Sequence, residues 1–273
     1  MERVVKHESR GRLTKDGIRI YEDGDFAGMH AAGAVAAGIL DAMSDYVFVG
    51  QTTGKIDEVI TQMVEDAGAK SATIGYKGYK HASCISVNHV VCHGIPGEKV
   101  LKDGDILNID VTVIVDGWYG DTSRMYVAGK LPRKAERLIE VTHDALMRGI
   151  EAVKPGNTFG DIGHSIQRFV ESHKMSVVRD FCGHGLGQVF HSPPNVLHYG
   201  RPGTGAMLEP GMFFTIEPMV NLGRPETKTL ADDWTAVTRD KSLSAQFEHS
   251  VGVTEAGCEI FTLSPADRFH PTY

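Results

Sequence analysis

Two aspartates on one predicted hairpin are the first residues whose spacing suggests chemistry. Residues 106–115 alternate between apolar and polar side chains, a period-two pattern that is typical of a β-strand with two different faces. Asp116-Gly117 follows as a two-residue turn of the type that matches the twist of the flanking strands. With this turn, Asp110 and Asp121 become diagonal neighbours on one face of the hairpin, about 7 Å apart at the backbone.

A pair of carboxylates this close has two interpretations. On a sheet rich in valine and isoleucine the two charges repel each other unless a proton or a cation lies between them, which favours a shared metal ion. The alternative is that one aspartate lies in water at a frayed strand end and has no chemical role. The hairpin alone leaves both open, but it predicts a register with Asp110 opposite Ser123 and Asp121 opposite Thr112.

Length and composition narrow the class of protein. The chain has 273 residues and a net charge of −7, which argues against the clustered basic surface of a nucleic-acid-binding protein. Residues 1–20 lack the apolar run of a secretory signal, and we expect no later stretch to be long enough to span a membrane. The cysteines show no C-x-x-C spacing, so we expect reduced thiols and a cytoplasmic protein.

The elements that must position the hairpin occur in a repeated order of two helices followed by strands. Residues 1–24 are charged and predict an irregular arm on the surface. Helices are predicted over 29–43 (with Asp25 as a cap), 53–67, 133–153 and 159–172. After Lys174 the pattern predicts strands only.

The chain also repeats itself at long range. A motif of one glycine, one threonine and two isoleucines occurs twice at an offset of 106 residues, as Gly50-x-Thr52 with Ile56 and Ile60 and as Gly156-x-Thr158 with Ile162 and Ile166. A second motif occurs twice at an offset of 107, as Leu101, Gly104 and Asp110 and as Leu208, Gly211 and Glu217. Because this period is far longer than that of a solenoid, we predict one domain with two pseudo-equivalent halves, approximately 25–127 and 128–263.

The repeat changes the interpretation of the two aspartates. Asp110 and Glu217 occupy equivalent strand positions, so we expect them to face each other across the axis that relates the halves. The strand predicted over 244–253 supplies Glu248 as the partner of Glu217, as Asp121 is the partner of Asp110. Four converging carboxylates predict a dinuclear cation site between the halves.

Three histidines are candidates for the same site. A lone histidine is more often a structural residue, but His184, flanked by glycines in CGHGLG, would be the natural nitrogen ligand beside four carboxylates. His93 and His191 lie next to glycine or proline turns, where side chains tend to line pockets, and either could donate a hydrogen bond to a substrate carbonyl. We interpret the other histidines as structural or surface groups, and His249 as pointing away from the metals.

Five segments together resemble the type I methionine aminopeptidases, namely CISVNHVVCHGIP, LKDGDILNIDVTVIVDGWYGDTSRM, SVVRDFCGHGLGQVFHSPPNVLHY, LEPGMFFTIEPMV and SLSAQFEHSVGVT. The resemblance extends from the first predicted helix to Leu263. It implies an α+β pita-bread fold, a curved antiparallel sheet with two pseudo-symmetric halves and helices on the outer face. It also implies a single catalytic domain over residues 1–273 that hydrolyses the first peptide bond and removes an N-terminal methionine, preferably when the second residue is small.

The resemblance implies two divalent metal ions (Co, Mn or Fe, with Zn as an alternative), bound by Asp110, Asp121, His184, Glu217 and Glu248. Asp121 and Glu248 would bridge the ions. Asp110 would complete one ion's ligand set, and His184 and Glu217 the other's. A ligand set rich in oxygen with one histidine suits Mn, Fe or Co better than a structural zinc site.

The same resemblance assigns the substrate contacts. His93 and His191 would contact the substrate, and Glu217 would carry the proton to the leaving amine. The methionine pocket maps to a soft aromatic cage that suits a thioether, formed by Tyr76, Tyr79, Cys84, Phe190 and Trp234. Two departures concern this pocket. Thr73 stands where many bacterial members have cysteine, and Ser192-Pro193 stands where acidic residues are common.

The expected partner is the N-terminal methionine of nascent polypeptides. We expect a monomer without specific nucleic-acid or membrane binding, and association with the ribosome is left open. Two alternatives are a related Xaa-Pro aminopeptidase-like peptidase and a non-catalytic binding protein on the same fold. The chain length and the aromatic cage argue against the first, and the filled ligand positions argue against the second.

Overall fold

A computed structural model describes residues 10–271 of the chain. Its helices are α1 (Phe26–Ala42), α2 (Thr53–Asp66), α3 (Arg133–Glu151) and α4 (Phe159–Ser172), with short 3₁₀ turns η1 (Asp23–Asp25), η2 (Met43–Asp45) and η3 (Tyr76–Gly78). Its strands are β1 (Arg12–Leu13), β2 (Arg19–Ile20), β3 (Lys70–Ser71), β4 (Ser83–Val87), β5 (Val90–Cys92), β6 (Asp105–Val115), β7 (Trp118–Ala128), β8 (Ser176–Val177), β9 (Gly183–Gly185), β10 (Ser192–Val196), β11 (Phe213–Ile216), β12 (Met219–Asn221), β13 (Thr227–Thr229), β14 (Ala236–Thr238), β15 (Ser244–Gln246), β16 (His249–Thr254) and β17 (Gly257–Ile260).

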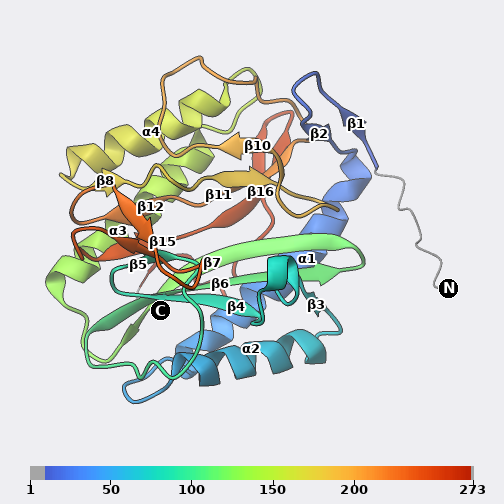
Figure 1. Ribbon diagram of the computed structural model, residues 1–273. Helices are drawn as coiled ribbons and strands as arrows, with labels where there is room; N and C mark the ends of the chain where they lie inside the picture. The colour runs from blue at the N-terminus through green and yellow to red at the C-terminus, as the bar shows by residue number, and fades with distance from the viewer. Residues whose placement is uncertain (1–9, 272–273) are drawn as a thin grey trace.

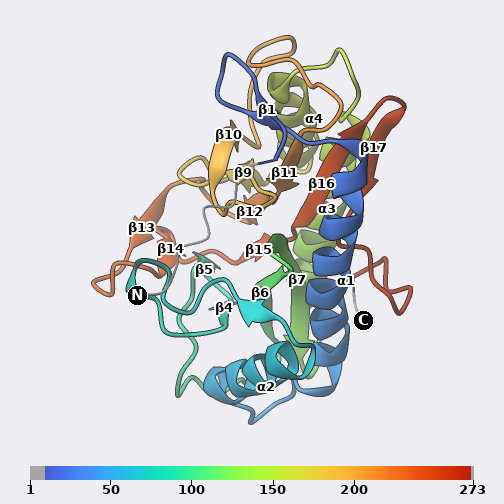
Figure 2. The same ribbon diagram turned by 90° about the vertical axis from the view of Figure 1, so that its right-hand side faces the viewer.

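The strands form antiparallel sheets that are backed by helices. β3, β6, β4 and β7 form one sheet, and β10, β9, β11, β16 and β17 form another. Figure 1 shows the sheets between α4 and α2, and Figure 2 shows α1 and α3 along one side of them, with β13 and β14 on the opposite side. The predicted α+β pita-bread class is confirmed.

The β6–β7 hairpin has the predicted register. Asp110 pairs with Ser123 and Thr112 with Asp121, around a turn that ends the ladder at Val115. The φ angles of Asp116 and Gly117 are 48° and 84°, as a primed turn requires, and glycine adopts such angles without strain. The local pattern of alternation was therefore sufficient to predict this element.

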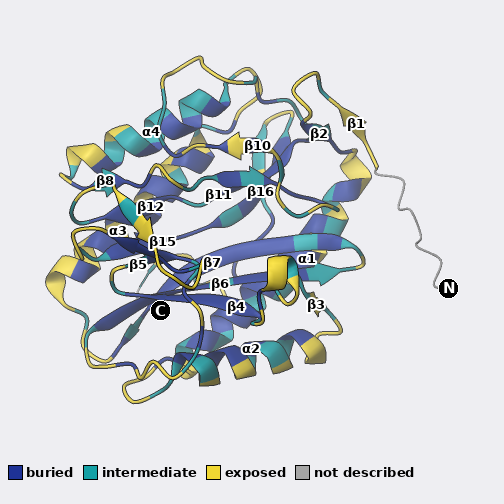
Figure 3. Cartoon of the chain, in the orientation of Figure 1, coloured by how far each residue is buried: buried dark blue, intermediate teal, exposed yellow. Residues whose placement is uncertain are grey.

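The sequence repeat has a matching structural repeat. Thr52 and Thr158 occupy the N-cap positions of α2 and α4, and each forms an isolated bridge to a strand-like residue, Val100 and Met207 respectively. The repeated isoleucines are fully buried at Ile56, Ile60, Ile162 and Ile166. The core follows the same division, because one apolar cluster joins α1 and α2 to β6 and a second joins α3 and α4 to β11 and β16. Figure 3 shows these inner faces as buried and the outer faces of α2 and α4 as exposed.

The predicted helices differ from the observed ones mainly at their ends. The third begins at Arg133 as predicted and ends at Glu151, two residues early, while the fourth matches over Phe159–Ser172. Asp25 occupies the N-cap of α1, but its side chain makes no capping hydrogen bond. It instead accepts hydrogen bonds from Glu22 N at 3.0 Å and from Arg10 at 3.1 Å.

The segment Asp23–Asp45, which contains α1, is long and apolar enough to cross a membrane by length and composition. The prediction that no stretch would pass this test is therefore wrong. Within the fold α1 has a buried face of small residues, and a side chain at Gly33 would collide with the backbone of Phe261. A helix that is buried in a protein core can be as long and as apolar as a helix that spans a membrane.

The described part of the predicted arm is only partly irregular. Its residues 10–24 include the short hairpin β1–β2, and Ile18, Ile20 and Tyr21 are buried. The ring of Tyr21 stacks on Phe213 with centroids 4.6 Å apart. The prediction of a surface arm is thus wrong for residues 18–21, where three apolar side chains are buried, whereas residues 10–17 are mostly exposed. Residues 1–9 lie outside the described residues.

Candidate metal centre

A cavity of about 500 Å³ lies where the two halves meet. It is lined by all of the residues that the sequence nominated, namely His93, His191, Asp110, Asp121, His184, Glu217, Glu248, Tyr76, Tyr79, Cys84, Phe190 and Trp234. They come from strands and loops of both halves, so the tertiary fold brings together side chains that are up to 172 positions apart, from Tyr76 to Glu248. A cavity with converging polar groups is the usual form of a small-molecule site.

Asp121, His184 and Glu248 form the tightest group. Each offers an atom that could bind a metal ion, and these atoms all lie within 4.8 Å of one another. The Nε2 atom of His184 is 3.4 Å from Asp121 Oδ2 and 3.7 Å from Glu217 Oε1. The imidazole therefore faces carboxylates from both halves.

Glu248 is placed differently from the prediction of one strand over residues 244–253. The structure has β15 and β16 there, separated by Phe247 and Glu248. At this break Glu248 N donates a hydrogen bond to Ser123 O at 3.1 Å, which forms a bridge to β7 of the first half. The break is thus the place where the two halves are joined beside the carboxylates.

Burial and mutual repulsion raise the pKa of three of these carboxylates. The pKa of Asp110 lies well above its usual value because of burial, with further contributions from the charges of Asp121 and Glu217. The pKa of Glu248 is raised in the same way. Burial raises the pKa of Glu217 to about 7, although nearby His184 opposes the shift. Ionised carboxylates in this cavity therefore require a compensating positive charge.

The donor set fits divalent cations. No lysine or arginine is among the described residues that line the cavity. Within the group of Asp121, His184 and Glu248, His184 is the side chain that can carry a positive charge. Burial would lower the pKa of His184, but Asp121 and Glu217 outweigh it and raise that pKa. One protonated imidazole cannot balance four carboxylates, whereas two divalent ions bound by oxygen and nitrogen atoms can.

Glu217 is oriented by neighbours that the sequence did not nominate. Its Oε1 accepts a hydrogen bond from Thr215 Oγ1 at 2.9 Å, and its Oε2 accepts one from Gln246 Nε2 at 3.2 Å. Its backbone N–H donates to Nε2 of the fully buried His198 at 3.0 Å. Thr215 and Gln246 each precede an acidic residue by two positions, and this period-two spacing is the signal that could have found them.

His93 and His191 both occupy the left-handed backbone region, with φ angles of 56° and 58°. Burial lowers the pKa of both, and for His191, where nearby His184 adds to the effect, to about 4. Both rings are therefore neutral at pH 7. The hydroxyl of Tyr76 lies 2.8 Å from Nδ1 of His191 and holds that ring in place.

The remaining predicted residues form an aromatic wall. Tyr79 packs on Trp234 with centroids 4.9 Å apart, and Tyr76 packs on Phe190 at 5.1 Å. Burial, with the nearby charge of Asp110 as a further cause, raises the pKa of Cys84, so this residue contributes a neutral thiol. The cavity lining also includes residues that the sequence analysis did not nominate, among them Phe181, Cys182 and Met219.

The two departures noted in the sequence lie on the cavity wall. Thr73 lines the cavity and its hydroxyl donates a hydrogen bond to His81 O at 2.7 Å, which a cysteine would make only weakly. Ser192 and Pro193 begin β10 and also line the cavity. The cavity wall is therefore uncharged at these two positions.

Comparison with known proteins agrees with this geometry. Residues 27–255 match the model of metallopeptidase family M24. The chain is 54% identical to a methionine aminopeptidase of Rickettsia prowazekii over 94% of this chain and 99% of that protein. It is 50% identical to a methionine aminopeptidase of Escherichia coli K12 over 92% of this chain and 96% of that protein.

Solved structures give the same result. The crystal structure of methionine aminopeptidase from Rickettsia prowazekii superposes with a TM-score of 0.89 at 55% identity, covering 90% of this chain and 100% of that one. The enzyme from Thermotoga maritima gives 0.88 at 40% identity, covering 90% and 99%. A prolidase from Pyrococcus furiosus gives 0.71 at 20% identity, over 89% of this chain and only 65% of that one, which shows a shared fold alone.

The buried carboxylates, the histidine and the M24 match define a metal-dependent peptidase, and the chain belongs to metallopeptidase family M24. Within that family it belongs to the methionine aminopeptidases, whose specific reaction is removal of an N-terminal methionine. The recognition made from the sequence segments is confirmed. The Xaa-Pro alternative is disfavoured, since the prolidase resembles this chain in fold only.

Proposed function

We propose that this chain removes the N-terminal methionine from nascent polypeptides and peptides, preferably when the second residue is small. The observation that carries this proposal is the position of the carboxylate and histidine group beside an aromatic cavity. A metal-dependent peptidase needs the carboxylate and histidine group, and a pocket for a thioether side chain needs the aromatic cavity. We further propose that residues 1–273 form one catalytic domain, with halves at approximately 25–127 and 128–263.

The proposed ligands of two divalent cations are Asp110, Asp121, His184, Glu217 and Glu248. The first half would supply Asp110 and Asp121 to hold the ions, and the second half would supply His184, Glu217 and Glu248. Support comes from the oxygen-rich donors with one imidazole, which favour Mn, Fe or Co, with Zn as an alternative. When bound, the cations would supply a water molecule activated for attack on the carbonyl carbon.

The chain's own residues have separate parts in the proposed reaction. His191, held by the Tyr76 hydroxyl, would donate a hydrogen bond to the substrate carbonyl, and His93 would contact the scissile amide. Glu217, held by Thr215 and Gln246, would carry the proton to the leaving amine. A fixed carboxylate can move a proton without first reorganising its neighbours.

The proposed methionine pocket is the aromatic wall with its thiol. Tyr76, Tyr79, Phe190 and Trp234 provide flat apolar surfaces, and Cys84 provides a polarisable sulfur atom in the lining. Such surfaces contact an unbranched thioether favourably. We further propose a monomer in the cytoplasm that binds neither nucleic acid nor membrane, consistent with its net charge of −7.

The test is cleavage of two peptides by the purified chain with added Mn or Co. We expect release of methionine from a Met-Ala peptide and no cleavage of an Ala-Pro peptide. Activity should disappear when a chelator is added and return with the metal. Cleavage of the Ala-Pro peptide without release of methionine would instead support the Xaa-Pro alternative.

A further inference from the structure

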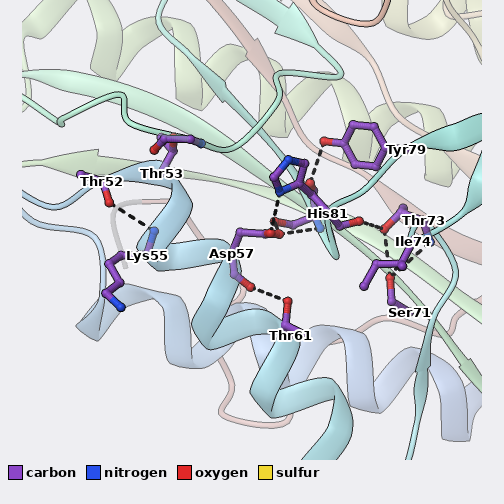
Figure 4. Close-up of polar contacts among 12 residues, drawn as sticks. Thr52, Thr53, Lys55, Asp57, Thr61, Ser71, Thr73, Ile74, Tyr79 and His81 are labelled. Carbon is purple, nitrogen blue, oxygen red and sulfur yellow. Dashed lines mark hydrogen bonds and ion pairs between the residues drawn. The ribbon is translucent and has the colours of Figure 1, made fainter.

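A polar cluster lies behind the aromatic wall, outside the cavity itself. Its centre is Asp57 on the inner face of α2, a carboxylate whose side chain is only 10% exposed and does not line the cavity. Asp57 Oδ1 accepts hydrogen bonds from Ser83 N at 2.9 Å and from Ser83 Oγ at 2.7 Å. Its Oδ2 lies 3.0 Å from Nδ1 of His81 (Figure 4). The Asp57 side chain thus binds both His81 and Ser83, where the chain enters β4.

The segment that Asp57 holds is closed on itself. The hydroxyl of Thr73 donates a hydrogen bond to His81 O at 2.7 Å, and the hydroxyl of Tyr79 donates one to Ser83 O at 2.9 Å. In Figure 4 the hydrogen bonds of Thr73 and of Asp57 both end on His81, one at its backbone carbonyl and the other at its ring. Residues 73–83 therefore form a loop whose base is fixed to α2 through His81 and Ser83.

This loop carries the first-half part of the aromatic wall. Thr73, Tyr76 and Tyr79 lie within it, and Cys84 follows directly after Ser83. Between them the backbone has no extended regular structure, with positive φ angles at Gly75, Lys77 and Gly78, and most of its residues are exposed or only partly buried. Ring contacts hold Tyr76 and Tyr79 on the side of the cavity. The polar anchor at Asp57 fixes the other end of the loop, because it ties His81 and Ser83 to α2.

We propose that Asp57 is a positioning residue for substrate selection, which holds the Thr73–Cys84 segment so that Tyr79 and Cys84 shape the cavity for an unbranched side chain. This inference rests on the proposed function, because it takes the cavity as the methionine pocket. Asp57 acts through Ser83 and His81 and touches neither the carboxylate group nor the substrate. It would therefore affect the choice of substrate more than the chemical step.

A purely structural role makes a different prediction. Replacing Asp57 by alanine leaves the Ser83 N–H and hydroxyl unpaired in a buried site, which lowers stability whatever the loop does. A structural role would lower the amount of folded enzyme and thus kcat equally for every substrate. A positioning role raises KM for peptides that begin with methionine. It also reduces the ratio of kcat/KM between methionine and branched side chains.

The kinetic test compares Asp57→Ala, Asp57→Asn and a control, Asp66→Ala. Asp66 lies on the same helix but is exposed. The hydrogen bond observed for its side chain comes from Gln62 of that helix. With Met-Ala and Leu-Ala peptides, we expect Asp57→Ala to lose about tenfold in its preference for methionine, mainly through KM. Asp57→Asn should keep most of that preference, since an amide oxygen still accepts from Ser83 and its NH₂ can donate to His81. Asp66→Ala should match the wild type.

A second readout does not depend on activity. The chain has two tryptophans, Trp118 and Trp234, so Trp118→Phe makes Trp234, which packs on Tyr79, the sole reporter. In metal-free protein, we expect Asp57→Ala to increase acrylamide quenching of Trp234 by about a factor of two, because the loosened loop exposes the indole. Asp57→Asn and Asp66→Ala should leave the quenching unchanged.

The outcomes separate the two proposals. If the wild type releases methionine while folded Asp57→Ala keeps both its selectivity and its Trp234 quenching, the positioning role is overturned. If the wild type releases no methionine but quenching still changes, the proposed function fails and the positioning of the loop by Asp57 is supported. Should Asp57→Ala not fold, His81→Ala removes the partner of Oδ2 at a site that is 31% exposed, together with a ring contact to Tyr79 at 5.7 Å, whereas Ser83→Ala removes one hydroxyl partner of Oδ1. Unchanged selectivity and quenching in both His81→Ala and Ser83→Ala would then overturn the role.

Discussion

The two halves of the molecule supply equivalent acidic pairs through different connections. In the first half, Asp110 and Asp121 lie on two 11-residue strands joined by a two-residue turn. In the second half, the chain from Glu217 passes through β12, β13, β14 and β15 before it reaches Glu248, directly before β16. The first arrangement is a short, regular platform, whereas the second leaves room for additional structure.

The longer connection has a function that the short turn cannot provide. It contains the β13–β14 hairpin, whose loop carries Trp234, and β14 pairs with β5 of the first half. Trp234 thereby packs on Tyr79, a residue of the first half. Both halves therefore supply carboxylates, but the longer connection of the second half also contributes the Trp234 ring that packs against Tyr79 of the first half.

The largest expected effect comes from the platform half. Asp121→Asn removes one charge from the carboxylate that lies 3.4 Å from His184, so we expect loss of both metal binding and peptide cleavage. The loss should exceed the roughly 10–100-fold effect of removing an outer hydrogen-bond partner. Metal content by mass spectrometry and methionine release measure the two properties. A fully active variant would show that the halves do not share a metal site.

A matched pair of threonines tests the two halves directly. Thr112 donates a hydrogen bond to Asp121 at 2.7 Å, and Thr215 donates one to Glu217 while its hydroxyl also accepts from His184 N at 3.0 Å. We expect Thr215→Val and Thr112→Val each to weaken metal binding by about 10–100-fold, with Thr215→Val the more severe. Calorimetric titration with Mn measures this. Equal losses would mean that the second contact of Thr215 has no effect.

Acid should weaken metal binding, and Glu217 of the second half is one of the groups that take up a proton. The pKa of Glu217, raised by burial to about 7, means that this carboxyl holds a proton below pH 7 in the absence of metal. A metal ion must displace that proton, so the apparent affinity should fall as the pH falls through 7, by about tenfold per pH unit for each proton displaced. Titrations at pH 6 and pH 8 check the sign. In Glu217→Gln the remaining pH dependence should be smaller.

The smallest expected effect comes from the added hairpin alone. Trp234→Ala removes the ring that faces Tyr79, so we expect KM for a Met-Ala peptide to rise by about tenfold while metal content stays unchanged. Kinetics and metal analysis on the same preparation check the rise in KM and the unchanged metal content. Loss of metal in this variant would contradict the separation between platform and wall.

Local patterns predicted the local elements well. The β6–β7 register, the start of α3 and both ends of α4 follow from alternation, turn residues and helical periodicity, which act between residues close in sequence. The repeat of Gly50 and Thr52 at 106 residues also anticipated an observed equivalence, since Thr52 and Thr158 both occupy helix N-caps. Recognition of the family rested on whole motifs rather than on these patterns.

Other features could not be predicted from nearby residues. The burial of Ile18, Ile20 and Tyr21 depends on a docking surface around Phe213, and the break at Glu248 depends on Ser123 of the other half. The contacts of Asp57 with His81 and Ser83 join positions 24 and 26 apart. No periodicity relates such residues.

The strands, the helices and the doubling of the acidic pair could all be inferred from the order of residues along the chain. The meeting of Asp121, His184 and Glu248 within 4.8 Å, and the contact of Trp234 with Tyr79, depend on how the folded halves pack. The physical reason is that local propensity acts over a few residues along the chain. The cavity, by contrast, arises where two buried cores pack together, and its shape depends on every contact between them.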